Sequence, residues 1–155
     1  MSEHSLISVL APSLLWQSFV ALNEVPRPSK KEEKVIAFML DFAKSLGLEV
    51  DQDAVGNIRI LKPATAGMES LPVVTLQSHL DMVHQKNKET VFDFNTQGIQ
   101  MVLEGDWVKA KGTTLGADNG IGVAAIMALL QATDIPHGPL EALFTVDEET
   151  GMKGA

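Results

Sequence analysis

Apolar positions in the N-terminal third of the chain repeat with the period of a helix. The periodicity at 12–24 predicts an amphipathic helix there. Pro26 and Pro28 then interrupt the pattern, because each fixes its own φ and disfavours helix in the residue before it. A second apolar stripe follows and predicts a second helix. Its members are Val35, Ile36, Met39, Leu40, Ala43 and Leu46.

Both ends of this second helix have sequence signals. Ser29 is followed three residues later by Glu32, which matches a capping box at a helix N-terminus. Gly47 comes directly after the last apolar position of the stripe. Helices often end with a residue of positive φ, which glycine adopts easily, so Gly47 predicts the C-terminus of this helix.

After residue 47 the pattern changes to short alternating or continuous apolar runs. The run at 72–77 predicts a strand buried on both faces, and 140–146 predicts another buried strand. Helix 119–131 separates them. The remaining expected strands are 48–50 and 55–60 around a turn at 53–57, then 100–104 and 107–110. Strands that alternate with helices predict an α/β sandwich with a mixed or mostly parallel sheet.

Composition narrows the chemistry that such a domain can perform. The 155 residues fit one domain with a real core. The formal net charge of −8, from 12 basic and 20 acidic residues, argues against a nucleic-acid surface. The absence of cysteine excludes a disulfide framework, a thiol nucleophile and Cys-ligated zinc. A metal site would therefore use carboxylates and the four histidines.

The apolar stretch at 6–22 is not typical of a targeting signal. Pro12 interrupts it, and no Lys or Arg precedes it, because the first is Arg27. A signal peptide has a basic start, and a membrane span has about 20 apolar residues. We therefore expect a cytoplasmic protein with no membrane partner.

The first candidate cluster is His79 and Asp81, directly after the strand expected at 72–77. Residues two apart on an extended chain face the same way, so these side chains can meet. A carboxylate that binds one ring nitrogen leaves the other free for a metal ion. The alternative is a histidine bonded to a turn aspartate without a ligand, and on this motif alone it is favoured.

The second cluster is the glycine-rich segment 112–122, which contains Asp118 and Asn119. Its glycines allow unusual backbone angles and a close approach to a ligand. A phosphate-binding loop lacks support here, because the Gly-Lys-Ser/Thr ending is missing. Asp118 would be a metal ligand held on a rigid turn. The alternative, which the segment alone slightly favours, is that Asp118 or Asn119 is the N-cap of the helix 119–131.

The third cluster is Asp147, Glu148 and Glu149 at the end of the strand expected at 140–146. Three neighbouring acids repel one another unless a positive group lies between them. On an extended chain Glu148 and Glu149 would point to opposite sides, so one could bind a metal while the other reaches a water molecule. The alternative is a solvated acidic turn.

Together the clusters offer one imidazole and several carboxylates at strand ends, where α/β folds bind ligands. This set of ligands suits zinc, manganese or cobalt. A bridging carboxylate with two metal ions would polarise a carbonyl and generate hydroxide, and an unligated glutamate could act as general base.

The segments in this order resemble the co-catalytic di-zinc peptidases and deacylases related to aminoacylase and carboxypeptidase G. Within that family the chain is most similar to the aminoacyl-histidine dipeptidases. The segments that match are 62–69, 79–83, 85–87, 112–122 and 148–152. The resemblance implies a three-layer α/β sandwich with a mixed, mostly parallel sheet of the zinc-exopeptidase type, here truncated.

The resemblance also implies a role for each matching residue. His79 and Glu149 would bind metal, Asp118 would bridge two divalent ions, and Asp81 would orient the His79 ring. The ions would be zinc, with manganese or cobalt as alternatives. Glu148 would be the general base for a metal-bound hydroxide that hydrolyses an aminoacyl-histidine dipeptide, the small-molecule partner of the site.

The chain also departs from the family pattern. A further metal-binding acid, a distant histidine and the lid or dimerisation domain are missing before the chain stops at Ala155. His4, His84 and His137 do not match ligand positions, and His84 is expected to be an exposed loop residue. We therefore expect residues 1–155 to be the N-terminal part of a catalytic domain, inactive alone and homodimeric in its full-length form.

Three alternatives remain open on the sequence. A related deacylase or tripeptidase would share the metal motifs and differ in substrate. A non-catalytic α/β fragment would use the same half-domain for binding or assembly. A nucleotide-binding domain is the weakest, because the glycine-rich segment lacks the phosphate-binding lysine.

Overall fold

The main body of the protein is a four-stranded sheet in the order β1-β2-β6-β3, seen in a computed structural model that describes residues 6–154. Apolar side chains at alternate positions of two of its strands are fully buried, namely Ile58 and Ile60, and Ala142 and Phe144. The strands are β1 Glu49–Gln52, β2 Ile58–Lys62, β3 Val74–His79 and β6 Leu140–Thr145. β2 pairs antiparallel with both β1 and β6, and β3 pairs parallel with β6.

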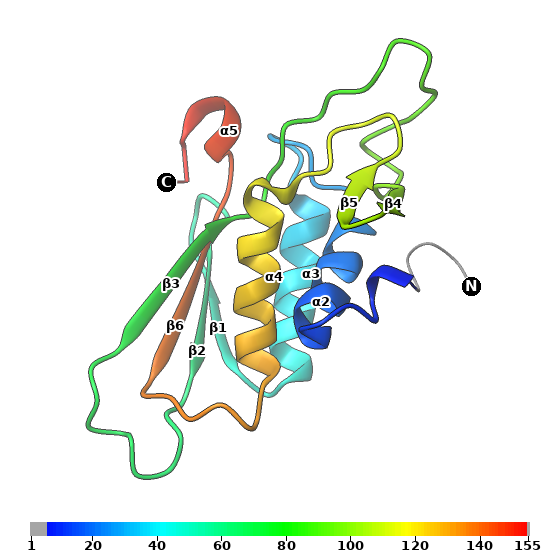
Figure 1. The fold of residues 1–155 in the computed structure, drawn as a ribbon. Helices are drawn as coiled ribbons and strands as arrows, with labels where there is room; N and C mark the ends of the chain where they lie inside the picture. Colours follow the sequence, from blue (N-terminus) through cyan, green and yellow to red (C-terminus); the bar gives the residue numbers. More distant parts are fainter. Residues whose placement is uncertain (1–5, 155) are drawn as a thin grey trace.

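Three helices lie on one side of the sheet (Figure 1). They are α2 Ser13–Asn23, α3 Glu33–Ser45 and α4 Ala117–Gln131. Side chains from all three helices and from the inner face of the sheet form one buried cluster, because each element hides one apolar side. Its largest members include Leu22, Met39, Ile58, Ile60, Leu80, Met127 and Phe144.

The expected mixed α/β sheet is confirmed, with two differences. Two of the three pairings in the main sheet are antiparallel, because β1 and β2 form a hairpin and β2 runs against β6. Figure 1 shows α2, α3 and α4 on the same side of the sheet, so residues 6–154 form two of the three expected layers.

Strand β3 is less buried than its apolar sequence predicts. Val74, at its start, is 50% exposed, so burial on both faces is wrong for this end of the strand. In the sheet described here β3 has β6 as its neighbour on one edge only. Its last residues, Ser78 and His79, are buried.

A small second sheet packs beside the helices. It is the hairpin of β4 Met101–Glu104 and β5 Trp107–Ala110, as the sequence predicts. Gly105 in its turn has a φ of +59°, a conformation that glycine adopts without strain. Among the described helices, none is both long enough and apolar enough to cross a membrane.

The second predicted helix ends as expected but begins differently. Gly47 has a φ of +67° directly after the helix, which confirms the predicted C-terminus. The capping box is wrong: α3 begins at Glu33, and no side chain caps it. Ser29 Oγ instead donates to Asp81, and the Glu32 carboxylate accepts the Lys30 and Asp147 amides. Both side chains are used by contacts with distant parts of the chain.

Candidate metal centre

The predicted site residues meet at one edge of the main sheet. His79 is the last residue of β3, and Glu148 lies just beyond β6. Because β3 and β6 are parallel, their carboxyl ends lie at the same edge. Asp118, at the start of α4, comes to this edge from the helix layer, because α4 packs against β3.

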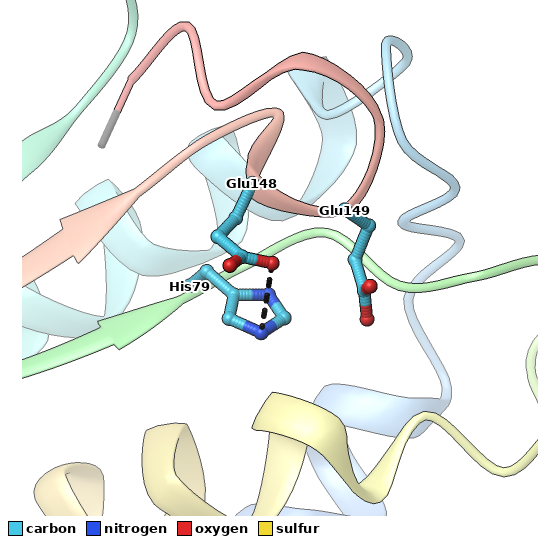
Figure 2. Close-up of side chains that lie close together, drawn as sticks. All are labelled: His79, Glu148 and Glu149. Carbon is cyan, nitrogen blue, oxygen red and sulfur yellow. Dashed lines mark ion pairs between the residues drawn. The ribbon is translucent and has the colours of Figure 1, made fainter.

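The imidazole of His79 lies between carboxylates on both of its nitrogen sides. Nδ1 is 3.4 Å from Asp81 Oδ1 and 3.1 Å from the Asp81 carbonyl oxygen. Nε2 is 3.2 Å from Asp118 Oδ1. It is also 3.8 Å from Glu148 Oε2, an ion pair drawn in Figure 2. The hydrogen bond to Asp81 raises the pKa of His79 to about 9 against the opposing effect of burial, and Asp118 acts in the same direction.

Asp81 is fully buried and holds the three segments of the site together. Its Oδ1 accepts the Glu148 amide at 3.0 Å, and its Oδ2 accepts the Glu149 amide at 3.1 Å and Ser29 Oγ at 2.7 Å. Burial alone would raise the pKa of Asp81. The hydrogen bonds from His79, Ser29 and the two amides outweigh burial and lower it well below its usual range.

Asp118 is on the predicted turn, but it is not a helix cap. The N-cap position of α4 is Gly116, and no side-chain cap hydrogen bond is present there. Asp118 and Asn119 have non-helical backbone angles, so the regular helix begins after them. The Asp118 side chain is 85% exposed, yet its Oδ1 contacts His79. The Asp118 carboxylate therefore faces His79, and its role as a metal ligand stays a prediction.

Glu148 and Glu149 lie in the short helix α5, Glu148–Gly151. The extended conformation assumed from the sequence is wrong, because the chain turns at Asp147, whose φ is +51°. The two side chains nevertheless differ in position: Figure 2 shows Glu148 beside the His79 ring and Glu149 further along the edge. Burial raises the pKa of Glu149, with the Asp118 and Glu148 charges acting in the same direction.

The set of ligand atoms at this edge fits a divalent cation. One ligand atom each of His79, Glu148 and Glu149 lies within 4.8 Å of the others, and Asp118 contacts His79. Carboxylates this close repel one another unless a cation or a proton lies between them. A divalent cation at this edge would relieve the repulsion, and it would compete with a proton for the His79 ring. Imidazole with carboxylates is a typical zinc set of ligands.

A second acidic group lies behind the first and was missed by the sequence analysis. Glu32, Asp81 and Asp147 are buried with ligand atoms within 4.8 Å of one another. Burial raises the pKa of Glu32, opposed by the amides that it accepts. These contacts join residues 32, 81 and 147, which no local spacing connects.

His84 and His137 belong to neither of these groups. His84 is exposed and its ring packs edge-on against Phe94 with centroids 5.8 Å apart, as expected for a loop residue. His137 Nδ1 is 2.7 Å from the Gly138 carbonyl oxygen, in the loop before β6. His4 lies outside the described residues.

Comparison with known proteins gives consistent results in sequence and in structure. The chain is 52% identical over all 155 residues to cytosol non-specific dipeptidase from Escherichia coli K12, of which it covers 31%. The crystal structure of aminoacylhistidine dipeptidase from Vibrio alginolyticus superposes with a TM-score of 0.93 at 51% identity. That match covers 96% of this chain and 30% of the other.

More distant matches share the fold. A tripeptidase structure from Staphylococcus aureus gives a TM-score of 0.73 at 24% identity, over 91% of this chain and 38% of the other. No family model matches the chain. The chain spans about a third of the length of the dipeptidases that it matches.

Proposed function

We propose that the chain supplies part of the catalytic centre of a metal-dependent dipeptidase. It matches the N-terminal fragment of a peptidase family that includes the E. coli and Vibrio dipeptidases. The observation that supports this most directly is the meeting of His79 with Asp118, Glu148 and Glu149 at the edge where β3 and β6 end. The domain proposed is the N-terminal part of a metallopeptidase catalytic domain, spanning 1–155.

The proposed metal ligands are His79, Asp118 and Glu149, with Asp118 shared between two divalent ions. Zinc is the first choice from the ligand chemistry, with manganese and cobalt as alternatives. When bound, such ions act as Lewis acids that polarise the scissile carbonyl and lower the pKa of water. Asp81 would fix the His79 ring so that Nε2 faces the metal side.

Glu148 is the proposed general base. Its carboxylate would take a proton from the attacking water and give it to the leaving amine as the peptide C–N bond breaks. The Asp81 carboxylate accepts a hydrogen bond from the backbone amide of Glu148. This bond positions the Glu148 side chain beside His79 and leaves its carboxylate free of Asp81. The substrate proposed is a small dipeptide of the aminoacyl-histidine type, as the name of the Vibrio relative suggests.

The names of the relatives bear on location, and the assembly is a separate proposal. The name of the E. coli relative begins with "cytosol", and we propose the cytoplasm for this protein also. A homodimer is proposed for the full-length form. The dipeptide is the proposed ligand, and the acidic balance of the chain gives no support to a nucleic-acid partner.

A tripeptidase is the second candidate function. Peptidase T from Citrobacter koseri is 56% identical over 46 residues, which is 28% of this chain. The metal ligands would be the same and the substrate longer. A panel of dipeptides, tripeptides and N-acyl amino acids, each compared by kcat/KM, would separate a dipeptidase from a tripeptidase and from a deacylase.

Metal binding provides the direct test of the site. Replacing His79 by alanine should weaken zinc binding to the 155-residue chain at least about 100-fold, because even outer partners of a ligand contribute 10–100-fold. Isothermal titration with zinc measures the change. His137→Ala, outside the site, is the control and should bind zinc like the wild type. Equal affinity of wild type and His79→Ala would refute the metal centre and favour a non-catalytic binding fragment.

The isolated chain should not hydrolyse alanyl-histidine above the rate of a blank that contains zinc. The proposed ligands His79, Asp118 and Glu149 are too few to give two catalytic metal ions three protein ligands each, even with Asp118 shared. Chromatographic measurement of released histidine tests this. Turnover that disappears in Glu148→Gln would contradict it and would mean that residues 1–155 form a complete site.

A further inference from the structure

A buried arginine lies directly beneath the candidate metal centre. Arg27 is 1% exposed, and its guanidinium lies between the end of β3 and the loop before α4. Nη1 donates to the Leu80 carbonyl at 3.0 Å and to the Asp81 carbonyl at 3.4 Å. Nη2 donates to the Gly116 carbonyl at 2.6 Å and to Asn23 Oδ1 at 3.2 Å.

Two glycines of the 112–122 segment make room for this guanidinium. A Cβ at either Gly116 or Gly120 would lie 2.6 Å from Arg27 Nη2, closer than two such atoms can approach. Gly116 also has a φ of +69°, which favours glycine. We expected these glycines to allow a close approach to a ligand. At these two positions the group that approaches the backbone closely is instead the protein's own Arg27.

The backbone of Arg27 also bonds to the segment 80–82, in addition to the bonds from its side chain. The Met82 amide donates to the Arg27 carbonyl at 3.1 Å, and the Ser29 amide donates to the Met82 carbonyl. Residues 27–29 thus run beside 81–82 in parallel, joined at the Pro28–Met82 bridge. The side chain then extends this attachment across to Gly116, two residues before Asp118.

Burying the charge of Arg27 in this position costs free energy of folding, because the guanidinium loses its hydration. Burial lowers the pKa of Arg27 to about 10, although the charge of Asp81 opposes the change. Its Nε has no hydrogen-bond partner. Replacing a buried charge by a packed apolar group is often neutral or stabilising in proteins, so stability alone is a weak account of this arginine. Its fork-shaped geometry, which reaches two separate backbone segments, is what an apolar residue lacks.

We propose that Arg27 is a positioning residue for the metal centre, which holds the segment of His79 and Asp81 at a fixed distance from the turn of Asp118. The proposal rests on the proposed function, because it assigns these residues to a metal site. Arg27 contacts neither substrate nor metal in this role. It acts through the carbonyls of Leu80, Asp81 and Gly116.

The test compares Arg27→Lys and Arg27→Ala in the 155-residue chain by amide hydrogen exchange. The hydrogen-bonded amides of Leu80, Met82 and Gly120 should exchange at least about tenfold faster, because local opening raises exchange only near the lost contact. Amides of the β1–β2 hairpin should keep wild-type rates. Lysine keeps the charge but lacks the planar fork, so it should not restore protection. Arg59→Lys, at an exposed ion pair with Asp51, is the matched control.

Chemical rescue separates positioning from general stability. Millimolar guanidinium should restore slow exchange in Arg27→Ala by filling the vacated site, whereas methylammonium should not. Cobalt, added alone as a spectroscopic probe, should bind Arg27→Lys about 10–100-fold more weakly than wild type, the usual loss for an outer partner of a metal ligand. Gly120→Ala, which displaces the guanidinium without removing it, should give the same local pattern if the Arg27 variants do not fold.

The results distinguish this proposal from the proposed function. Faster exchange at every amide, or no rescue by guanidinium, would overturn the positioning role and leave Arg27 a stability residue. Local exchange and cobalt affinity that both stay at wild-type values would overturn it also. If wild type shows no His79-dependent cobalt binding, the metal centre fails, and the exchange measurements still decide whether Arg27 holds the two segments together.

Discussion

Replacing Glu148 by glutamine should lower kcat by about 10²–10⁴-fold in a chimera that joins residues 1–155 to the remainder of the E. coli dipeptidase. The chimera supplies the two thirds of the relative that this chain does not cover, and the 52% identity of the matching part favours correct packing. Glutamine keeps the size of the side chain and removes its ability to accept a proton. Steady-state hydrolysis of alanyl-histidine gives kcat and KM.

The geometry at Glu148 leaves two roles to be separated. Its Oε2 is 3.8 Å from His79 Nε2, and a ligand atom of Glu148 lies as close to His79 and Glu149 as those of a metal site would. A general base and a metal ligand can both occupy such a position. A base that is not a ligand can be replaced without loss of metal, whereas a ligand cannot.

Metal content therefore decides the assignment. Glu148→Gln should retain the zinc of the unmodified chimera, whereas Glu149→Gln should lose part of it, as measured by elemental mass spectrometry. Glu141→Gln, on the open face of β6 and away from the site, should have normal activity and metal content. Retained kcat in Glu148→Gln would refute the base, and a loss of zinc would make Glu148 a ligand instead.

Most of the helices and strands could be predicted from the sequence, although the short helix α5 could not. Apolar periodicity located α2, both hairpins and the two strands that deliver His79 and Glu148. The meeting of these residues could also be predicted, because parallel strands end at one edge. Alternation of strands and helices did not determine strand direction, and the sheet is parallel in only one of its three described pairings.

The support behind the site could not be predicted in the same way. Ser29 and Glu32 have the spacing of a capping box, yet they bond to residues more than 50 positions away. Arg27 carries no motif at all, although it contacts two site segments. A local sequence pattern reflects only contacts between residues that are neighbours along the chain. These side chains instead bond to residues that become their neighbours only when the chain folds.

Replacing Asp81 by asparagine should lower the free energy of unfolding of the 155-residue chain by about 3–5 kcal/mol, the usual loss when one member of a buried charged network is removed. The asparagine amide group would face donors, because Asp81 oxygens accept Ser29 Oγ and the Glu148 and Glu149 amides. Urea denaturation followed by fluorescence of the two tryptophans measures the change.

The same substitution at an exposed aspartate provides the matched control. Asp51→Asn breaks an ion pair with Arg59 in which both side chains are about half exposed, and it should cost less than about 1 kcal/mol. Ser29→Ala removes one hydrogen bond to Asp81 and should cost an intermediate amount, about 1.5–3 kcal/mol. It keeps the series measurable if Asp81→Asn does not fold.

The dependence on pH tests the cause. The pKa of Asp81 is lower in the folded chain than its ordinary value of 3.8, so its stabilising effect is complete above that value and is lost as the pH falls further. The difference in unfolding free energy between wild type and Asp81→Asn should therefore be largest near neutral pH and decrease below pH 3.8. A difference that stays constant with pH would mean that Asp81 acts by shape alone. Equal losses of unfolding free energy in Asp81→Asn and Asp51→Asn would mean that the buried hydrogen bonds of Asp81 do not stabilise the fold.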